Sequence, residues 1–172
     1  MPTSDKHKHE PGRDCPLCPR LVEYRLAQRK LHPDWFNAPV PCFGTDDARL
    51  LVAGLAPGVA GANRTGRPFT GDHAGKLLYA TLLKFGLAQG EYLEDPNDGM
   101  RLLGCRITNA VKCLPPENKP LPAEVSECNG YLRAESNTAI PIGVYRAGGM
   151  RVVAGPLTIT ISQQACTASG VE

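Results

Sequence analysis

Two short apolar runs, each followed by a helical pattern, most constrain the fold of this 172-residue chain. The runs "RLLVAGLAP" at 49–57 and "LLGCRITNAVKC" at 102–113 have the apolar and β-branched content of buried strands. Apolar residues at helical spacing follow them, at 73–86 and at 121–132. Strands that alternate with helices favour a parallel sheet with helices on its faces. We therefore predict an α/β fold, with three α/β/α layers around a mostly parallel sheet.

The composition divides the chain into three parts. Residues 1–14 are polar and lack the apolar centre of a secretory signal, so we expect a flexible tail and a cytoplasmic protein. Residues 15–133, which open with a helical pattern at 15–32, are expected to form one domain. Charges become sparse in 134–172, where only "RVVAGPLTITIS" at 151–162 has the pattern of a strand. No apolar run approaches the ~18 residues of a membrane span, and a net charge of +2 permits a nucleic-acid partner without requiring one.

The stretch between the first strand and its helix, "GLAPGVAGANRTGRPFTGDHAG" at 54–75, is too long and too rich in glycine for a simple connector. Loops longer than about 12 residues inside compact domains are usually functional or disordered. A glycine-rich strand exit lets backbone N–H groups approach a ligand closely. We therefore predict that this loop binds a ligand.

Each polar or aromatic residue of this region has a structural alternative. Asp72 immediately precedes the predicted helix at 73–86, where aspartate is a favoured N-cap. Phe69 fits either the core or a platform for a base, and Arg64 and Arg67 fit either solvated charges or phosphate ligands. Asn109 lies in the second strand, where its amide either caps local backbone or pairs with the edge of a nucleobase.

Seven cysteines and no secretory signal favour metal binding over disulfides. "CPLC" is a Cys-x2-Cys pair, and two further cysteines follow the second strand and lie in the last helix. Strand ends and helix starts meet along one edge of such a sheet, which brings together Cys15, Cys18, Cys113 and Cys128. Four thiolates suit zinc or a [4Fe–4S] cluster, and the wide second spacing favours the cluster; scattered buried thiols are the alternative. Cys42, Cys105 and Cys166 stand alone.

Three separated segments together resemble the type-5 uracil-DNA glycosylases, iron–sulfur members of the uracil-DNA glycosylase superfamily. They are "CPLC", "GLAPGVAGANRTGRPFTGD" and "ITNAVKCLPPENKPLPAEVSEC", in the family's order and with its cysteine spacing. The resemblance runs from Cys15 to Leu132. Type-4 enzymes share the cysteines and "GRPF" but carry an acidic run after the first Pro-Gly, where this chain has 59-VAGAN-63. The type-5 enzymes therefore fit better.

The resemblance implies a base-excision repair enzyme that flips uracil, and other deaminated bases, out of DNA and hydrolyses the N-glycosidic bond. It implies that Asp72 stabilises the sugar cation and steers water to it, while Phe69 stacks on the base and Asn109 pairs with its edge. It implies a pocket floor of Leu55, Ala56 and Gly58, and phosphate contacts from Arg64 and Arg67. It also implies a bracing [4Fe–4S] cluster on Cys15, Cys18, Cys113 and Cys128, and we expect a monomer that binds uracil-containing DNA and no membrane.

The chain departs from this family in its last quarter. Family members carry a second catalytic motif of the His-Pro-Ser type near the C-terminus, and no histidine follows His73 here. We hypothesise an altered reading frame after "GYLRAE", which would remove the last strand–helix units of the sheet. The alternative function is a catalytically impaired form that keeps the cluster and weak DNA affinity. A zinc-stabilised nucleotide-binding domain is a third possibility, although the sequence contains no Gly-rich phosphate-binding motif.

Overall fold

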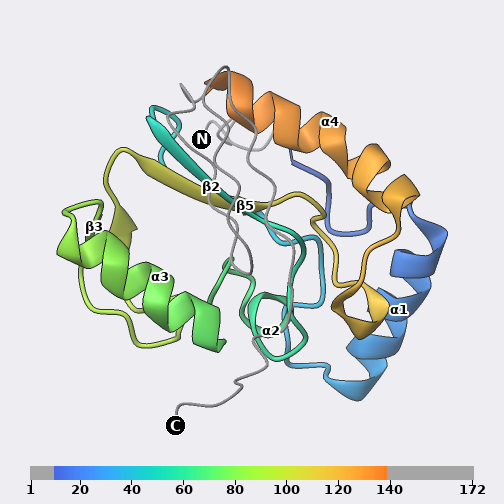
Figure 1. Cartoon of the computed structure of the whole chain (residues 1–172). Coiled ribbons are helices and arrows are strands. Elements are labelled where there is room, and N and C mark those ends of the chain that lie inside the picture. The colour runs from blue at the N-terminus through green and yellow to red at the C-terminus, as the bar shows by residue number, and fades with distance from the viewer. Residues whose placement is uncertain (1–9, 139–172) are drawn as a thin grey trace, which may run out of the picture.

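The computed structural model describes residues 10–138. The strand expected at 151–162, and residues 1–9 of the expected tail, lie outside the described residues. The elements, labelled in Figure 1, are α1 (Pro19–Leu31), β1 (Phe43–Gly44), β2 (Leu50–Gly54), α2 (Ala62–Thr65), α3 (His73–Lys84), β3 (Ala88–Gln89), β4 (Arg101–Leu102), β5 (Cys105–Asn109), the 3-10 helix η1 (Pro116–Asn118) and α4 (Pro122–Thr138). Among the described residues, no helix combines the length and apolar content that crossing a membrane requires.

The central sheet has three strands in the order β1-β5-β2. β2 and β5 are parallel, with a register that runs from Leu50↔Cys105 to Gly54↔Asn109. β1 pairs with the other edge of β5 in the antiparallel direction, and β3 and β4 form a separate antiparallel pair. The predicted α/β class is confirmed. The described sheet is mixed rather than mostly parallel, because the two-residue strand β1 completes it.

Helices cover both faces of this sheet, as the three-layer prediction requires. Successive strand residues point to opposite faces. Val52 accordingly packs in a core with Tyr79 and Leu82 of α3, whereas its neighbours Leu51 and Ala53 pack with Leu132 of α4. α1 joins the α4 side through a third core of Leu21, Val111, Cys113 and Cys128. Figure 1 shows α3 on one side of β2 and β5, and α4 and α1 on the other.

A buried arginine ties the loop between β2 and α3 to the rest of the fold. The Arg67 side chain is 4% exposed, and its Nη1 and Nη2 each donate to one carboxylate oxygen of Asp98 at 2.7 Å. Its Nε donates to Thr70 Oγ1, also at 2.7 Å. The guanidinium lies 5.2 to 5.7 Å from the ring centroids of Phe43, Tyr79 and Tyr92. The loop therefore rests on a charge that is paired and enclosed by aromatic rings.

This ion pair predicts acid sensitivity. The hydrogen bond from Arg67 lowers the pKa of Asp98 from 3.8 to about 2. A pKa lowered by folding contributes stability above the unfolded pKa, and this contribution is lost as the pH falls through the folded pKa. For Asp98→Asn we expect a loss of about 3 kcal/mol in the free energy of unfolding at neutral pH, because Arg67 stays buried without its anion. About 2 kcal/mol of that difference from the unmutated chain should disappear between about pH 4 and about pH 2. Urea unfolding of both proteins across this range measures it, and a difference that stays constant with pH would contradict the assignment.

Candidate active site

The long loop and Asn109 line one small hollow. The hollow has a volume of about 70 Å³ and lies where β2 and β5 end side by side. It brings together all six residues that were predicted for the base pocket and the catalytic carboxylate: Leu55, Ala56, Gly58, Phe69, Asp72 and Asn109. Gly54, Pro57, Ala62 and Ala74 complete its wall. Residues far apart in the sequence thus share one small cavity, as the resemblance implied; their roles remain predictions.

Two glycines allow the backbone of β2 and α3 to approach Phe69 and Asn109 closely. A Cβ on Gly54 would lie 2.9 Å from the Phe69 ring and closer still to the Asn109 side-chain oxygen. A Cβ on Gly75, in the first turn of α3, would lie 2.7 Å from the carbonyl carbon of Phe69. Real Cβ atoms essentially never come this close to other atoms. The strand and the helix therefore pack directly on Phe69 and Asn109 only because both positions lack a side chain.

Asn109 presents an unsatisfied donor in this hollow. The residue is 3% exposed, and its Nδ2 has no hydrogen-bond partner among the described residues. A buried donor without a partner costs about 1–3 kcal/mol. The local backbone cap, which the sequence left open for this amide, is therefore not formed by Nδ2. The amide is available to an acceptor on a bound molecule.

Phe69 is held in an uncommon backbone conformation. Its φ is +54°, in the left-handed region that bulky residues rarely adopt. The Tyr92 hydroxyl donates to the Phe69 carbonyl at 3.2 Å and accepts from the Gly71 N–H at 3.3 Å. The Tyr79 hydroxyl donates to the Pro68 carbonyl at 2.9 Å. Neither tyrosine could be predicted at this site from the sequence, because only the folded chain brings them to this loop.

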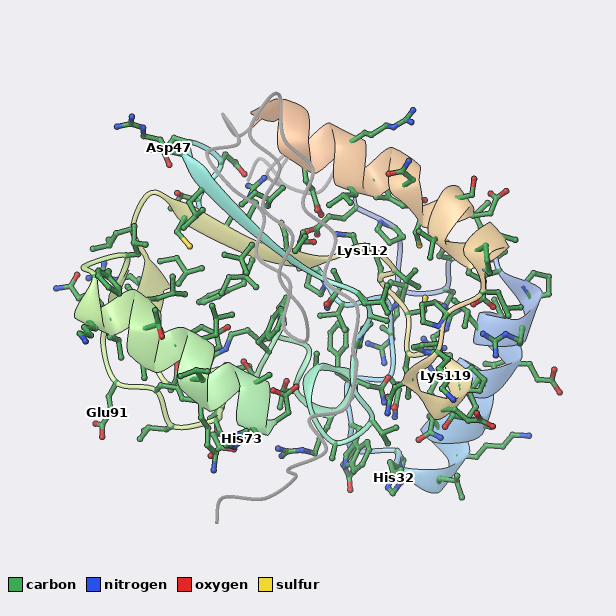
Figure 2. The ribbon with its side chains drawn as sticks, viewed as in Figure 1. His32, Asp47, His73, Glu91, Lys112 and Lys119 are labelled. Carbon is green, nitrogen blue, oxygen red and sulfur yellow. The ribbon has the colours of Figure 1, made fainter. Side chains whose placement is uncertain are left out.

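Asp72 both caps α3 and faces the hollow. It is the N-cap residue, and its Oδ1 accepts a hydrogen bond from the Gly75 N–H at 2.8 Å. It also belongs to the wall of the hollow, next to His73, which Figure 2 labels at the start of α3. The N-cap interpretation is therefore confirmed, and it is compatible with a role toward a ligand.

The two arginines of the loop have different surroundings in the structure. Arg64 is exposed, and its Nε donates to the Ala60 carbonyl at 2.8 Å, so a phosphate contact remains a prediction for it. Arg67 is buried, and its guanidinium is committed to Asp98 and Thr70. A phosphate contact by Arg67 does not fit this geometry, and we assign the residue to holding the loop instead.

The four predicted metal ligands line a second hollow. Cys15 and Cys18 reach it from the start of α1, Cys113 from the segment after β5, and Cys128 from α4. Burial raises the pKa of Cys18 to about 11 and that of Cys113 to about 12. Thiols of this kind stay protonated at neutral pH unless a metal binds them. Cys42 and Cys105 do not line this hollow, and Cys166 lies outside the described residues.

The spacing of the sulfurs bears on the metal. In a closed tetrahedral zinc site with Zn–S bonds of about 2.3 Å, the sulfurs lie about 3.8 Å apart. Among residues 10–138, no three of the four cysteine sulfurs all lie within 4.8 Å of one another.

A second cluster of possible metal ligands consists of Glu10, Cys42 and Glu135, whose ligand atoms do lie within 4.8 Å of one another. Hydrogen bonds account for this cluster: the Cys42 N–H donates to Glu10 at 2.7 Å, and Lys112 Nζ donates to Glu135 at 2.6 Å. Figure 2 shows Lys112 in the interior between the sheet and α4.

The close approach at Gly54 predicts a specific defect. In Gly54→Ala, the new methyl group must displace Phe69 or Asn109, so we expect a loss of about 1–3 kcal/mol in the free energy of unfolding. We also expect a shift of the Asn109 side-chain amide resonances in an NMR spectrum. Gly130→Ala is the control: its Cβ meets nothing within 4 Å in α4, and alanine there should stabilise the helix by up to about 1 kcal/mol. Equal stability of the two variants would contradict the packing described.

Comparison with known proteins agrees with this architecture. The chain matches the family model of the Uracil DNA glycosylase superfamily over residues 41–149, past residue 133, where we expected the family-like domain to end. It is 46% identical over 142 residues to the type-5 uracil-DNA glycosylase of Thermus thermophilus, which covers 78% of this chain and 64% of that protein. Over 139 residues it is 41% identical to the type-5 enzyme of Pyrobaculum aerophilum, covering 78% of this chain and 62% of that protein. The type-4 enzyme of the same organism is 36% identical over 125 residues, covering 72% of this chain and 50% of that protein. The chain spans less than two thirds of the length of these relatives, and it belongs to the uracil DNA glycosylase superfamily.

Proposed function

We propose that this protein excises uracil from DNA by hydrolysing the N-glycosidic bond, leaving an abasic site. The observation that carries the proposal is the buried Nδ2 of Asn109, which has no hydrogen-bond partner within residues 10–138 and belongs to a residue that lines a hollow with Phe69 and Asp72. The relatives that match most of this chain bear the name of the same activity, type-5 uracil-DNA glycosylase.

The hollow has the groups needed to recognise an extruded uracil. A glycosylase cannot reach the bond inside the base stack, so the nucleotide is flipped into a pocket. The Asn109 amide offers a donor for a uracil carbonyl, whereas the exocyclic amine of cytosine would place a donor against it. The Phe69 ring supplies a flat apolar surface on which the base stacks.

Asp72 supplies the charge that the reaction needs. Breaking the N-glycosidic bond leaves a cationic sugar, which a nearby carboxylate stabilises while it orients water toward the anomeric carbon. Among the described residues that line the hollow, Asp72 is the only carboxylate. Val59 follows Pro57-Gly58, so the chain has no polar residue there to activate water.

We further propose that Cys15, Cys18, Cys113 and Cys128 hold a [4Fe–4S] cluster. The donor set fits, and the sulfurs are spaced more widely than a single zinc ion requires. When bound, the cluster supplies iron–thiolate links among α1, the exit of β5 and α4. Its role is to brace the fold, and hydrolysis is assigned to the residues of the hollow.

A catalytically impaired glycosylase is the second candidate. Its premise is the resemblance, which implies a second catalytic motif with a histidine, whereas residues 74–172 contain none. A uracil-containing oligonucleotide distinguishes the two candidates. The active enzyme should generate alkali-cleavable sites at uracil and none in the matched thymine oligonucleotide. DNA binding without cleavage would identify the impaired form, and neither binding nor cleavage would contradict both.

The charge of Asp72 gives a sharper test. Asparagine caps helices about as well as aspartate, so Asp72→Asn should keep the fold of α3. It removes the negative charge that faces the sugar, and we expect the single-turnover rate of excision to fall about a hundredfold or more. The unmutated chain, measured in the same assay, provides the reference. Near-full activity of the asparagine form would reduce Asp72 to a helix cap.

The cluster assignment predicts colour. Protein purified without oxygen should be brown, with broad absorbance near ~400 nm from thiolate-bound iron. Alanine at any of the four cysteines of the second hollow should abolish this absorbance, whereas alanine at Cys42 or Cys105 should leave it unchanged. Metal analysis and the visible spectrum measure this. A colourless protein that carries stoichiometric zinc would be the contrary result.

A further inference from the structure

A buried arginine lies against the second hollow and forms no ion pair with any of residues 10–138. Arg25, in α1, is 4% exposed and is part of the wall formed by the four cysteines. Its Nη1 donates to the Cys113 sulfur at 3.5 Å, and its Nη2 donates to the Cys15 carbonyl at 3.0 Å. Its Nε has no hydrogen-bond partner among the described residues.

The other buried cations described above are paired. Arg67 binds Asp98 and Lys112 binds Glu135, in both cases between side chains that are almost fully buried. Two neighbouring arginines on the same helix also pair with carboxylates: Arg20 with Glu124, and Arg29 with Asp14. Within residues 10–138, Arg25 therefore contacts a thiol and a carbonyl but no carboxylate.

A buried charge without a counter-charge costs several kcal/mol. A site built around such a cation is therefore complete only when it holds an anion. Four cysteine thiolates around an iron–sulfur core carry more negative charge than the core neutralises, so the bound group as a whole is an anion. The Arg25 guanidinium lies where that charge would be, in contact with one of the four sulfurs.

We infer that Arg25 is the counter-charge of the metal cluster, and that it stabilises the bound cluster and raises its reduction potential. The inference rests on the proposed [4Fe–4S] cluster. Reduction adds a negative charge to the cluster, and a buried cation beside the sulfurs favours the more negative form.

Four proteins test the inference: the unmutated chain, Arg25→Met, Arg25→Lys and Arg29→Met. Methionine keeps much of the side-chain length but removes the charge and the donors, whereas lysine keeps the charge. Arg29 lies on the same helix, pairs with Asp14 and forms hydrogen bonds with the carbonyls of Arg13 and Asn37, so Arg29→Met is the matched control. The readouts are iron per chain, the midpoint potential from a spectroscopic redox titration, and the rate of iron loss to a chelator.

We expect Arg25→Met to bind iron about tenfold to a hundredfold less tightly and to have a lower midpoint potential. Arg25→Lys should lie between Arg25→Met and the unmutated chain, and Arg29→Met should match the latter. An Arg25→Met protein with unchanged iron retention and potential would overturn the inference and leave the cluster intact. The same conclusion follows if Arg25→Lys is as defective as Arg25→Met, because packing rather than charge would then explain both. An unmutated chain without iron would overturn the cluster proposal itself.

Discussion

The parallel pairing of β2 with β5 is the constraint on which both candidate sites depend. Its register ends with Gly54 opposite Asn109, and hydrogen bonds from Ala110 to Gly54 and from Val111 to Leu55 continue the pairing beyond the strands. The two carboxyl ends therefore leave the sheet at one edge, where ligands bind in open α/β sheets. Asn109 lines the first hollow, and Cys113, a few residues later, lines the second. A metal or cluster bound by Cys113 would therefore also limit the movement of the segment that carries Asn109.

Buried ion pairs position the segments around this edge. The Arg67–Asp98 ion pair fixes the loop that carries Phe69 and Asp72. The Lys112–Glu135 ion pair joins the segment after β5 to α4. The cost of removing two charges from water roughly cancels their attraction, so such pairs add little stability compared with well-packed apolar residues. Each pair does, however, impose one geometry, because a displaced partner would leave a buried charge alone. We therefore relate these pairs to the placement of the loop and of α4 rather than to the strength of the core.

The longer elements were predictable because their causes are local in the sequence, whereas the residues of the base pocket were implied by the resemblance to the type-5 enzymes. Apolar spacing indicated β2, α3, β5 and α4, and the alternation of strands with helices indicated the parallel pairing of β2 and β5. β1, β3 and β4 have two residues each, too few for a periodic pattern, and they exist only through their partners. The buried ion pair of Arg67 was not predictable for a related reason. An arginine in a polar loop has the pattern of a solvated charge, and its partner Asp98 and the surrounding rings come from distant parts of the sequence.

Asp72 is placed so that one side chain would meet both a structural requirement and the proposed catalytic one. The N-cap hydrogen bond from the Gly75 N–H engages Oδ1, which fixes the orientation of the carboxylate. The positive end of the α3 dipole favours a negative charge at this position, and a group that stabilises a cation must carry that charge. Asp72 Oδ2 lies close to Gly61: a Cβ built on that glycine would be 2.9 Å from Oδ2. Oδ1 therefore caps the helix and Oδ2 lies toward the loop, so the carboxylate is oriented before any substrate binds. A carboxylate oriented in this way pays no reorganisation cost when a cationic sugar forms beside it, which is the physical basis of electrostatic catalysis in such sites.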